Sequence, residues 1–216
     1  MKNFIKKLLT EALMGEDYPS DFSMDKFKTL SSFKDRIRYC QNTLQRISSG
    51  SSRIVYKIDD TKVLKLAKNR KGLAQCEVEA DYSKYKDINA VFAKTFDYEE
   101  NHLWIEMELA LPVKENDFQR IIGFSFKDYC AAINNYGNAV TTPSKRSYEM
   151  PIDKLIVARM WEDEFVFDMF QYIGNYDIPV GDLKRLNSYG IVKRDGADAI
   201  VLIDFGITQG VNSSYY

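Results

Sequence analysis

GDLKRLN at residues 181–187 and AIVLIDFG at residues 199–206 place an acid, an amide and a second acid around a short apolar strand. These polar residues are Asp182, Asn187 and Asp204. In phosphoryl transfer one carboxylate orients or deprotonates the acceptor, while an amide and a second carboxylate hold the magnesium ions that neutralise the phosphates. All three residues offer the hard oxygen ligands that Mg²⁺ prefers. The spaced set is much rarer than a DFG tripeptide alone, and it favours a magnesium and phosphate site at a strand end.

Upstream of this set, the hydrophobic pattern changes to a period of two at Leu44. LQRIS, RIVYKI and TKVLKLA predict three short strands, with the turn SGSS between the first two. Because the side chains of this turn are small, its backbone N–H groups can close over phosphates. A hairpin turn rich in Ser and Gly also forms without any ligand. Lys65, on the third strand, follows Gly50 by 15 residues. A lysine that faces inward from a strand is costly to bury unless an anionic group meets it.

The segment after these strands, roughly residues 72–86, is helical in pattern and carries Glu77 and Glu79. Either carboxylate could pair with Lys65 and hold it toward a phosphate. We prefer Glu79, because Tyr82 lies one turn further and would seat that face against the sheet. The other glutamate is expected on a solvated helix face.

The remaining elements complete a simple order along the chain. Strands at residues 90–98 and 103–111 follow the helix, so the order β-β-β-α-β-β predicts an antiparallel sheet that carries one helix. After Pro112 the pattern is helical, and a strand pair precedes Asp204. Helices are expected near residues 117–122, 126–135 and 152–172, and an exposed loop at 134–147. The expected divisions are a helical extension at 1–43, a first lobe at 44–111 and a second lobe at 112–216.

Composition narrows the class of protein. Thirty basic against thirty-one acidic residues give a net charge of −1, which argues against a polycation for nucleic acid or anionic membrane. Three separated cysteines and one histidine favour neither a disulfide scaffold nor a zinc site. The opening MKNFIKKLLTEALM lacks the features of a secretory signal, and no run approaches the ~20 apolar residues of a membrane span. We therefore expect a cytoplasmic protein without a nucleic-acid partner or transmembrane segment.

Residues 4–13 alternate apolar and basic residues at helical spacing and predict a short amphipathic helix. Such a helix would dock onto the body of the protein or onto a protein partner. Membrane binding is the alternative, and three lysines beside so short an apolar face argue less for it.

In this order the motifs resemble the protein kinase-like superfamily, which also contains small-molecule kinases related to aminoglycoside phosphotransferases. The resemblance covers roughly residues 44–206. It implies an α+β, two-lobe fold with a five-stranded antiparallel N-lobe sheet plus one helix and a reduced helical C-lobe. It also implies ATP and Mg²⁺ as cofactors.

The resemblance assigns a role to each matching residue. Asp182 would be the catalytic carboxylate, and Asn187 and Asp204 the metal ligands. Lys65 would contact the phosphates with Glu79 or Glu77 as its partner. The remaining positions would be the phosphate-covering Gly50, Ser51 and Ser52, the gatekeeper Met107, and the hinge Glu108 to Ala110, whose backbone would meet adenine.

Three departures from the superfamily pattern limit what the resemblance implies. The turn has one glycine instead of two or three, PVG replaces the usual His-Arg before Asp182, and ten residues follow Gly206. We therefore expect neither an APE element nor the platform on which protein kinases hold peptides.

Three functions are compatible with this pattern. The first is an ATP- and Mg²⁺-dependent phosphotransferase with an unidentified protein or small-molecule acceptor. The second is an inactive nucleotide-binding pseudokinase or interaction module. The third is adenylyl transfer, which would use the same residues with the nucleotide inverted. The opening and the compact body also resemble small proteins of large bacteriophages, which would place the protein in the host cytoplasm.

Overall fold

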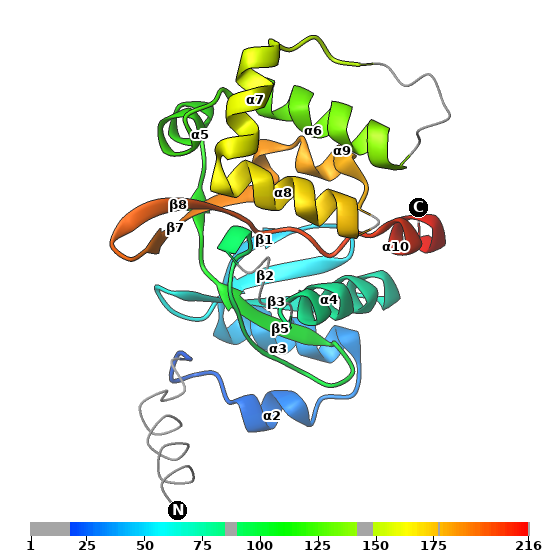
Figure 1. Cartoon of the computed structure of the whole chain (residues 1–216). Coiled ribbons are helices and arrows are strands. Elements are labelled where there is room, and N and C mark those ends of the chain that lie inside the picture. Colours follow the sequence, from blue (N-terminus) through cyan, green and yellow to red (C-terminus); the bar gives the residue numbers. More distant parts are fainter. Residues whose placement is uncertain (1–17, 85–89, 142–148, 177, 216) are drawn as a thin grey trace, which may run out of the picture.

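The computed structural model describes residues 18–84, 90–141, 149–176 and 178–215. Two lobes are visible, one built on a sheet and one mainly helical (Figure 1). The amphipathic helix expected at residues 4–13 lies outside the described residues. No described helix is long and apolar enough to cross a bilayer.

The first lobe contains the predicted five-stranded antiparallel sheet, in the order β1-β2-β3-β5-β4. Helix α4 (Arg70–Tyr82) joins β3 to β4 and packs on β3. The α+β class and the β-β-β-α-β-β order are thus confirmed. The strands are β1 (Gln45–Ser49), β2 (Arg53–Lys57), β3 (Lys62–Ala67), β4 (Thr95–Tyr98) and β5 (Trp104–Glu108).

Two predicted strands are shorter than expected. The strand expected at 103–111 ends at Glu108, and Leu111 pairs with Ile191 in the other sheet. The segment 90–98 joins the sheet only from Thr95, because its first part bonds to the other lobe. Phe92 bridges to Leu202 of the second lobe, and the Ala93 N–H donates to the Leu202 carbonyl at 3.0 Å. This segment therefore connects the two lobes instead of extending the sheet.

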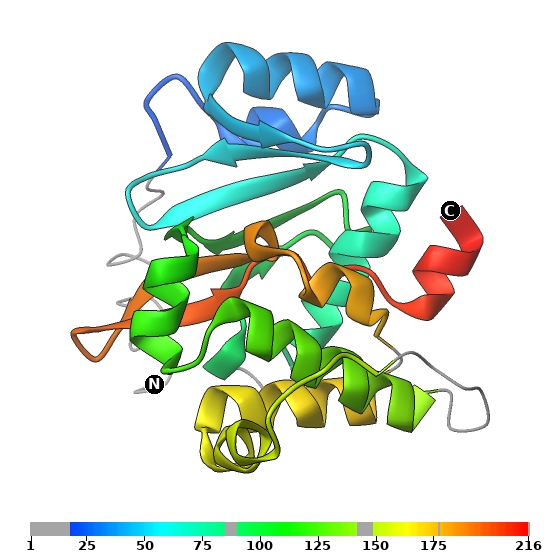
Figure 2. The ribbon, with the colours of Figure 1, turned by 90° about the horizontal axis from the view of Figure 1, so that it is seen from above.

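Strand alternation divides the first lobe into two faces. Ile54, Tyr56, Leu64 and Leu66 pack against α2 (Met24–Lys28) and α3 (Phe33–Thr43). Figure 2 shows α3 on one side of the sheet and the second lobe on the other. Because β3 alternates, Lys65 lies on the opposite face from its two leucine neighbours, toward α4 and the second lobe.

The second lobe combines a small antiparallel sheet, in the order β6-β7-β8, with a layer of helices. In Figure 1 the β7–β8 hairpin lies between these helices and the first sheet. The last helix, α10, contacts α4. The elements are β6 (Leu111–Pro112), α5 (Glu115–Ile122), α6 (Phe126–Thr141), α7 (Lys154–Glu162), α8 (Glu164–Asn175), α9 (Val180–Leu183), β7 (Tyr189–Arg194), β8 (Ala197–Leu202) and α10 (Gln209–Tyr215).

The structure corrects two expectations about these helices. Part of the segment expected as a loop at 134–147 is helical, because α6 continues to Thr141; residues 142–148 lie outside the described residues. Tyr136 holds this extension by packing on the Phe170 ring, with centroids 4.7 Å apart. The single helix expected at 152–172 is two helices, because Asp163 accepts a hydrogen bond from the Val166 N–H and begins α8.

Candidate nucleotide and phosphoryl-transfer site

A cavity of about 970 Å³ lies between the lobes. Its walls come from the β1–β2 hairpin, β3, the end of β5 and the segments around Asp182 and Asp204. Most sequence-predicted site residues line it: Gly50, Ser51, Ser52, Lys65, Met107, Glu108, Ala110, Asp182, Asn187 and Asp204. Glu79 is fully buried behind Lys65, whereas Glu77 is exposed.

Lys65 forms hydrogen bonds with one residue of each lobe. Its Nζ lies 3.0 Å from each carboxylate oxygen of Glu79 and donates to the Ile203 carbonyl at 2.6 Å. The structure therefore selects Glu79 over Glu77 as the partner of Lys65. The Glu79 carboxylate and the Ile203 carbonyl together compensate the buried charge of Lys65, which would otherwise be costly.

Arg53, which belongs to none of the sequence motifs, is the main addition to the site. Its Nη1 lies 2.7 Å from Glu79 Oε2, and its Nη2 donates to Asp204 Oδ1 at 2.7 Å. The Nη1 contact is an ion pair without hydrogen-bond geometry. Alternation along RIVYK could have found this residue, because Val55 pairs with Lys65 and Arg53 lies two positions earlier on the same face.

The charges of Arg53 and Asp204 stabilise each other. Burial acts to raise the pKa of Asp204, but Arg53, Lys65 and Arg185 outweigh burial and lower that pKa below its ordinary value. Burial acts to lower the pKa of Arg53, but Glu79 and Asp204 raise it above its ordinary value. Both side chains are therefore charged at neutral pH. The Asp204 side chain remains 54% exposed.

Side-chain hydrogen bonds from two later residues hold the backbone of the segment that carries Asp182. Ser188 Oγ donates to the Asp182 carbonyl and the Tyr189 hydroxyl donates to the Leu183 carbonyl, each at 2.8 Å. Asp182 Oδ1 lies 3.0 Å from Arg185 Nη1, and Arg185 lines the cavity. Lys184 points elsewhere, because its Nζ donates to Asn134 Oδ1 at 2.7 Å.

Helix α4 holds both the serine-rich turn and the DFG segment. Ser52 Oγ donates to Gln75 Oε1 at 2.5 Å. A Cβ at Gly72 would lie 2.3 Å from the Ser52 carbonyl oxygen, and a Cβ at Gly206 would lie 2.6 Å from the Gln75 carbonyl oxygen. Only glycine permits these two approaches, so the turn, the helix and the DFG segment are locked together.

Residues 108–110, the expected hinge, line the cavity, and the Glu108 side chain also joins the lobes. Both guanidinium nitrogens of Arg194 contact the Glu108 carboxylate, with Nη2 2.6 Å from Oε2. Arg194 belongs to β7 and Glu108 to β5, so this ion pair connects the two sheets.

The donors present fit a magnesium ion that arrives with a nucleotide. Asp204 presents a half-exposed, ionised carboxylate, and the exposed Asn187 lines the same cavity. No group of three or more His, Cys, Asp or Glu side chains that could hold a metal occurs among the described residues. Mg²⁺ commonly uses one or two carboxylates together with substrate phosphates and water, so a full protein cage is not required.

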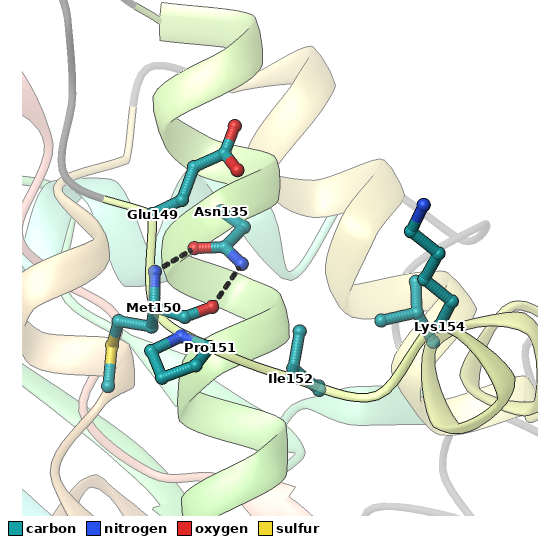
Figure 3. Close-up of a pocket in the computed structure, with 7 residues that line it drawn as sticks. Asn135, Glu149, Met150, Pro151, Ile152 and Lys154 are labelled. Atoms are coloured by element: carbon teal, nitrogen blue, oxygen red, sulfur yellow. Dashed lines mark hydrogen bonds between the residues drawn. The ribbon is translucent and has the colours of Figure 1, made fainter.

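A second, smaller pocket of about 400 Å³ lies far from this chemistry, beside α6 and the start of α7. Figure 3 shows the Asn135 amide bonded to the Met150 backbone: Nδ2 donates to the carbonyl and Oδ1 accepts from the N–H, both at 2.8 Å. The oxygen and the nitrogen of this amide are thus both bonded to the protein backbone. These two bonds give Asn135 a structural role, because they tie Met150 to α6.

Comparisons with known proteins found likeness only among solved structures. No protein-family model and no curated protein matches the chain. The chain is similar to the GDP complex of aminoglycoside 2'-phosphotransferase-IIIa, with 11% identity and a TM-score of 0.40 over 85% of this chain and 70% of that one. It is also similar to ADP-bound aminoglycoside phosphotransferase APH(2'')-Ib, with 12% identity and a TM-score of 0.34 over 81% and 69%. These neighbours have the protein kinase-like fold.

Proposed function

We propose that the protein is an ATP- and Mg²⁺-dependent phosphotransferase acting on a protein or small-molecule acceptor. One observation carries the proposal: Lys65, which is paired with the buried Glu79, borders the same cavity as Asp204 and Asp182 of the opposite lobe. An inert structural domain has no chemical need for this combination at an open cavity.

In the proposed complex each part of the cavity has a task. The backbone of residues 108–110 meets the base, and the serine-rich turn and Lys65 bind the phosphates. Asp204 and Asn187 would hold Mg²⁺, which neutralises phosphate charge during transfer. Asp182, fixed through the hydrogen bonds of its loop, orients the acceptor hydroxyl and accepts its proton.

Transfer from labelled ATP tests the proposal. The protein is incubated with γ-labelled ATP and Mg²⁺, alone and with cell lysate, beside Asp182→Ala. We expect label on the protein, on an acceptor or in released phosphate, and none of these with Asp182→Ala. Thermal stabilisation by MgATP without any transfer would contradict the proposal and support the binding module. Transfer from α-labelled ATP only would support adenylyl transfer instead.

A further inference from the structure

Arg53 is the one cavity-lining cation that contacts two different carboxylates among the described residues. It is 7% exposed and begins β2, directly after the serine-rich turn. Arg53 and Lys65 together balance Glu79 and Asp204, so this part of the cavity is neutral with no ligand bound. A planar guanidinium suits this position, because its fork can bind two oxygen groups at once.

The Arg53 guanidinium contacts Asp204, the residue that would bind the metal. Its Nη2 donates a hydrogen bond to Asp204 Oδ1 at 2.7 Å. A free divalent cation must therefore compete with the positive charge of Arg53 for this carboxylate. Arg53 Nη1 is buried and lies 2.7 Å from Glu79 Oε2, so the guanidinium spans the two carboxylates. Arginine N–H groups bind phosphate oxygens well, so a phosphate in the cavity would offer Arg53 a second set of acceptors.

We propose that Arg53 is a further nucleotide-binding residue that exchanges Asp204 for a phosphate when a nucleotide enters, which frees Asp204 for the metal. The inference rests on the proposed function and adds a residue to its site. Its consequence is that Asp204 binds a divalent cation weakly unless a nucleotide has drawn Arg53 away.

The test uses the full chain and two separate ligands. Mn²⁺ binding without nucleotide is measured by electron paramagnetic resonance, and binding of ATP in EDTA by calorimetry. Arg53→Gln should bind free Mn²⁺ at least about tenfold more tightly than wild type, because the competing charge is gone. The same variant should bind metal-free ATP at least about tenfold more weakly, because a phosphate contact is lost. A purely structural role would not produce opposite changes for the two ligands.

Two controls identify the site of the effect. The double variant Arg53→Gln with Asp204→Asn should lose the gained Mn²⁺ binding. Arg120→Gln removes an exposed arginine that pairs with Asp198 away from the cavity, and both affinities should stay as in wild type. We expect Arg53→Gln to fold, because Lys65 still balances the buried Glu79. If it does not fold, Arg53→Lys takes its place, since one ammonium cannot match both contacts, and the same opposite changes are expected in smaller measure.

The outcomes separate this inference from the proposed function. Unchanged Mn²⁺ affinity in Arg53→Gln, or a gain that survives loss of Asp204, would overturn the role of Arg53 while phosphoryl transfer by wild type stands. Unchanged affinity for metal-free ATP would do the same. Wild-type protein that binds no ATP, with or without metal, would overturn the proposed function and the inference together.

Discussion

Asp182 and Asp204 border the same cavity but have different partners, so their substitutions should have different effects. Asp182→Ala removes an interaction realised mainly in the transition state and should lower turnover ~10²-fold or more with MgATP affinity retained. Asp204→Ala should weaken MgATP binding more than about tenfold, because a metal ligand is lost. Calorimetry with MgATP compares the two variants. Equal, wild-type-like affinity in both would contradict the assignment of Asp204.

Lys184 and Arg185 are adjacent in sequence but point to different parts of the molecule. Arg185 lines the cavity beside Asp182, whereas Lys184 bonds to Asn134 of α6. Arg185→Ala should therefore lower turnover by about 10²-fold, as expected for loss of a charged group near the phosphates. Lys184→Ala should keep turnover and lose about 1 kcal/mol of unfolding free energy. Steady-state kinetics measure the turnover of both variants, and urea denaturation measures their unfolding free energy. Loss of turnover in Lys184→Ala but not in Arg185→Ala would refute the assignment of Arg185 to the cavity.

At the scale of elements, the fit between α4 and the serine-rich turn depends on Gly72. Its hydrogen points at the Ser52 carbonyl, and a methyl group would lie 2.3 Å from that oxygen. Gly72→Ala should cost about 1–3 kcal/mol of unfolding free energy and weaken ATP binding, because turn and helix must separate.

Gly181→Ala is the matched control, since a Cβ there meets nothing within 4 Å. Alanine in α9 should be neutral or slightly stabilising, because glycine is the weaker helix former. Denaturation curves together with ATP titrations measure both effects. Equal stability of the two variants would show that the turn adjusts without cost.

The same elements show how far local pattern reached. Alternation predicted the strands of the first sheet and the helix that follows, because periods of 2 and 3.6 belong to short stretches of chain. It was wrong where another lobe competed for the backbone. Phe92 and Ala93 bond to Leu202 of β8. The pattern was also wrong at Asp163, which caps α8 within a stretch that reads as one continuous helix.

At the scale of the whole molecule, the N-terminal part of the described chain is tied to the sheet through a half-buried carboxyl. Tyr18 donates from its hydroxyl to Glu106 Oε1 at 2.5 Å, and Glu106 lies in β5. Burial raises the pKa of Glu106, Tyr18 lowers it, Asp97 and Asp59 raise it and Lys62 lowers it, with a net rise above the ordinary 4.5.

This shift predicts a pH dependence of stability with a definite sign. The folded chain binds the Glu106 proton more tightly than the unfolded chain, so unfolding free energy should fall as pH rises from about 4.5 through the raised pKa. Glu106→Gln should remove this part of the profile and leave it flatter. Urea denaturation between pH 4 and pH 8 measures it, with the exposed Glu77→Gln as control. Parallel profiles for wild type and Glu106→Gln would contradict the prediction.

Two arginine bridges connect the lobes on either side of the cavity. Arg53 of the first lobe reaches Asp204 of the second, and Arg194 of the second reaches Glu108 of the first. Their partners lie 151 and 86 residues away in sequence. No spacing rule connects residues so far apart, so these bridges could not have been predicted from the sequence.

The sequence by itself determined the order of elements, the inward position of Lys65 and the set Asp182, Asn187 and Asp204. These depend on strand periodicity and on residue chemistry, both of which are readable along a short segment. Tertiary structure decided that Glu79 and not Glu77 faces Lys65, that Arg185 and not Lys184 faces the cavity, and that Arg53 stands against Asp204. The physical reason is that the direction of a side chain on a helix or tight turn depends on what packs against it, and here that neighbour is a strand of the same lobe for Glu79, a distant helix for Lys184 and the other lobe for Arg53.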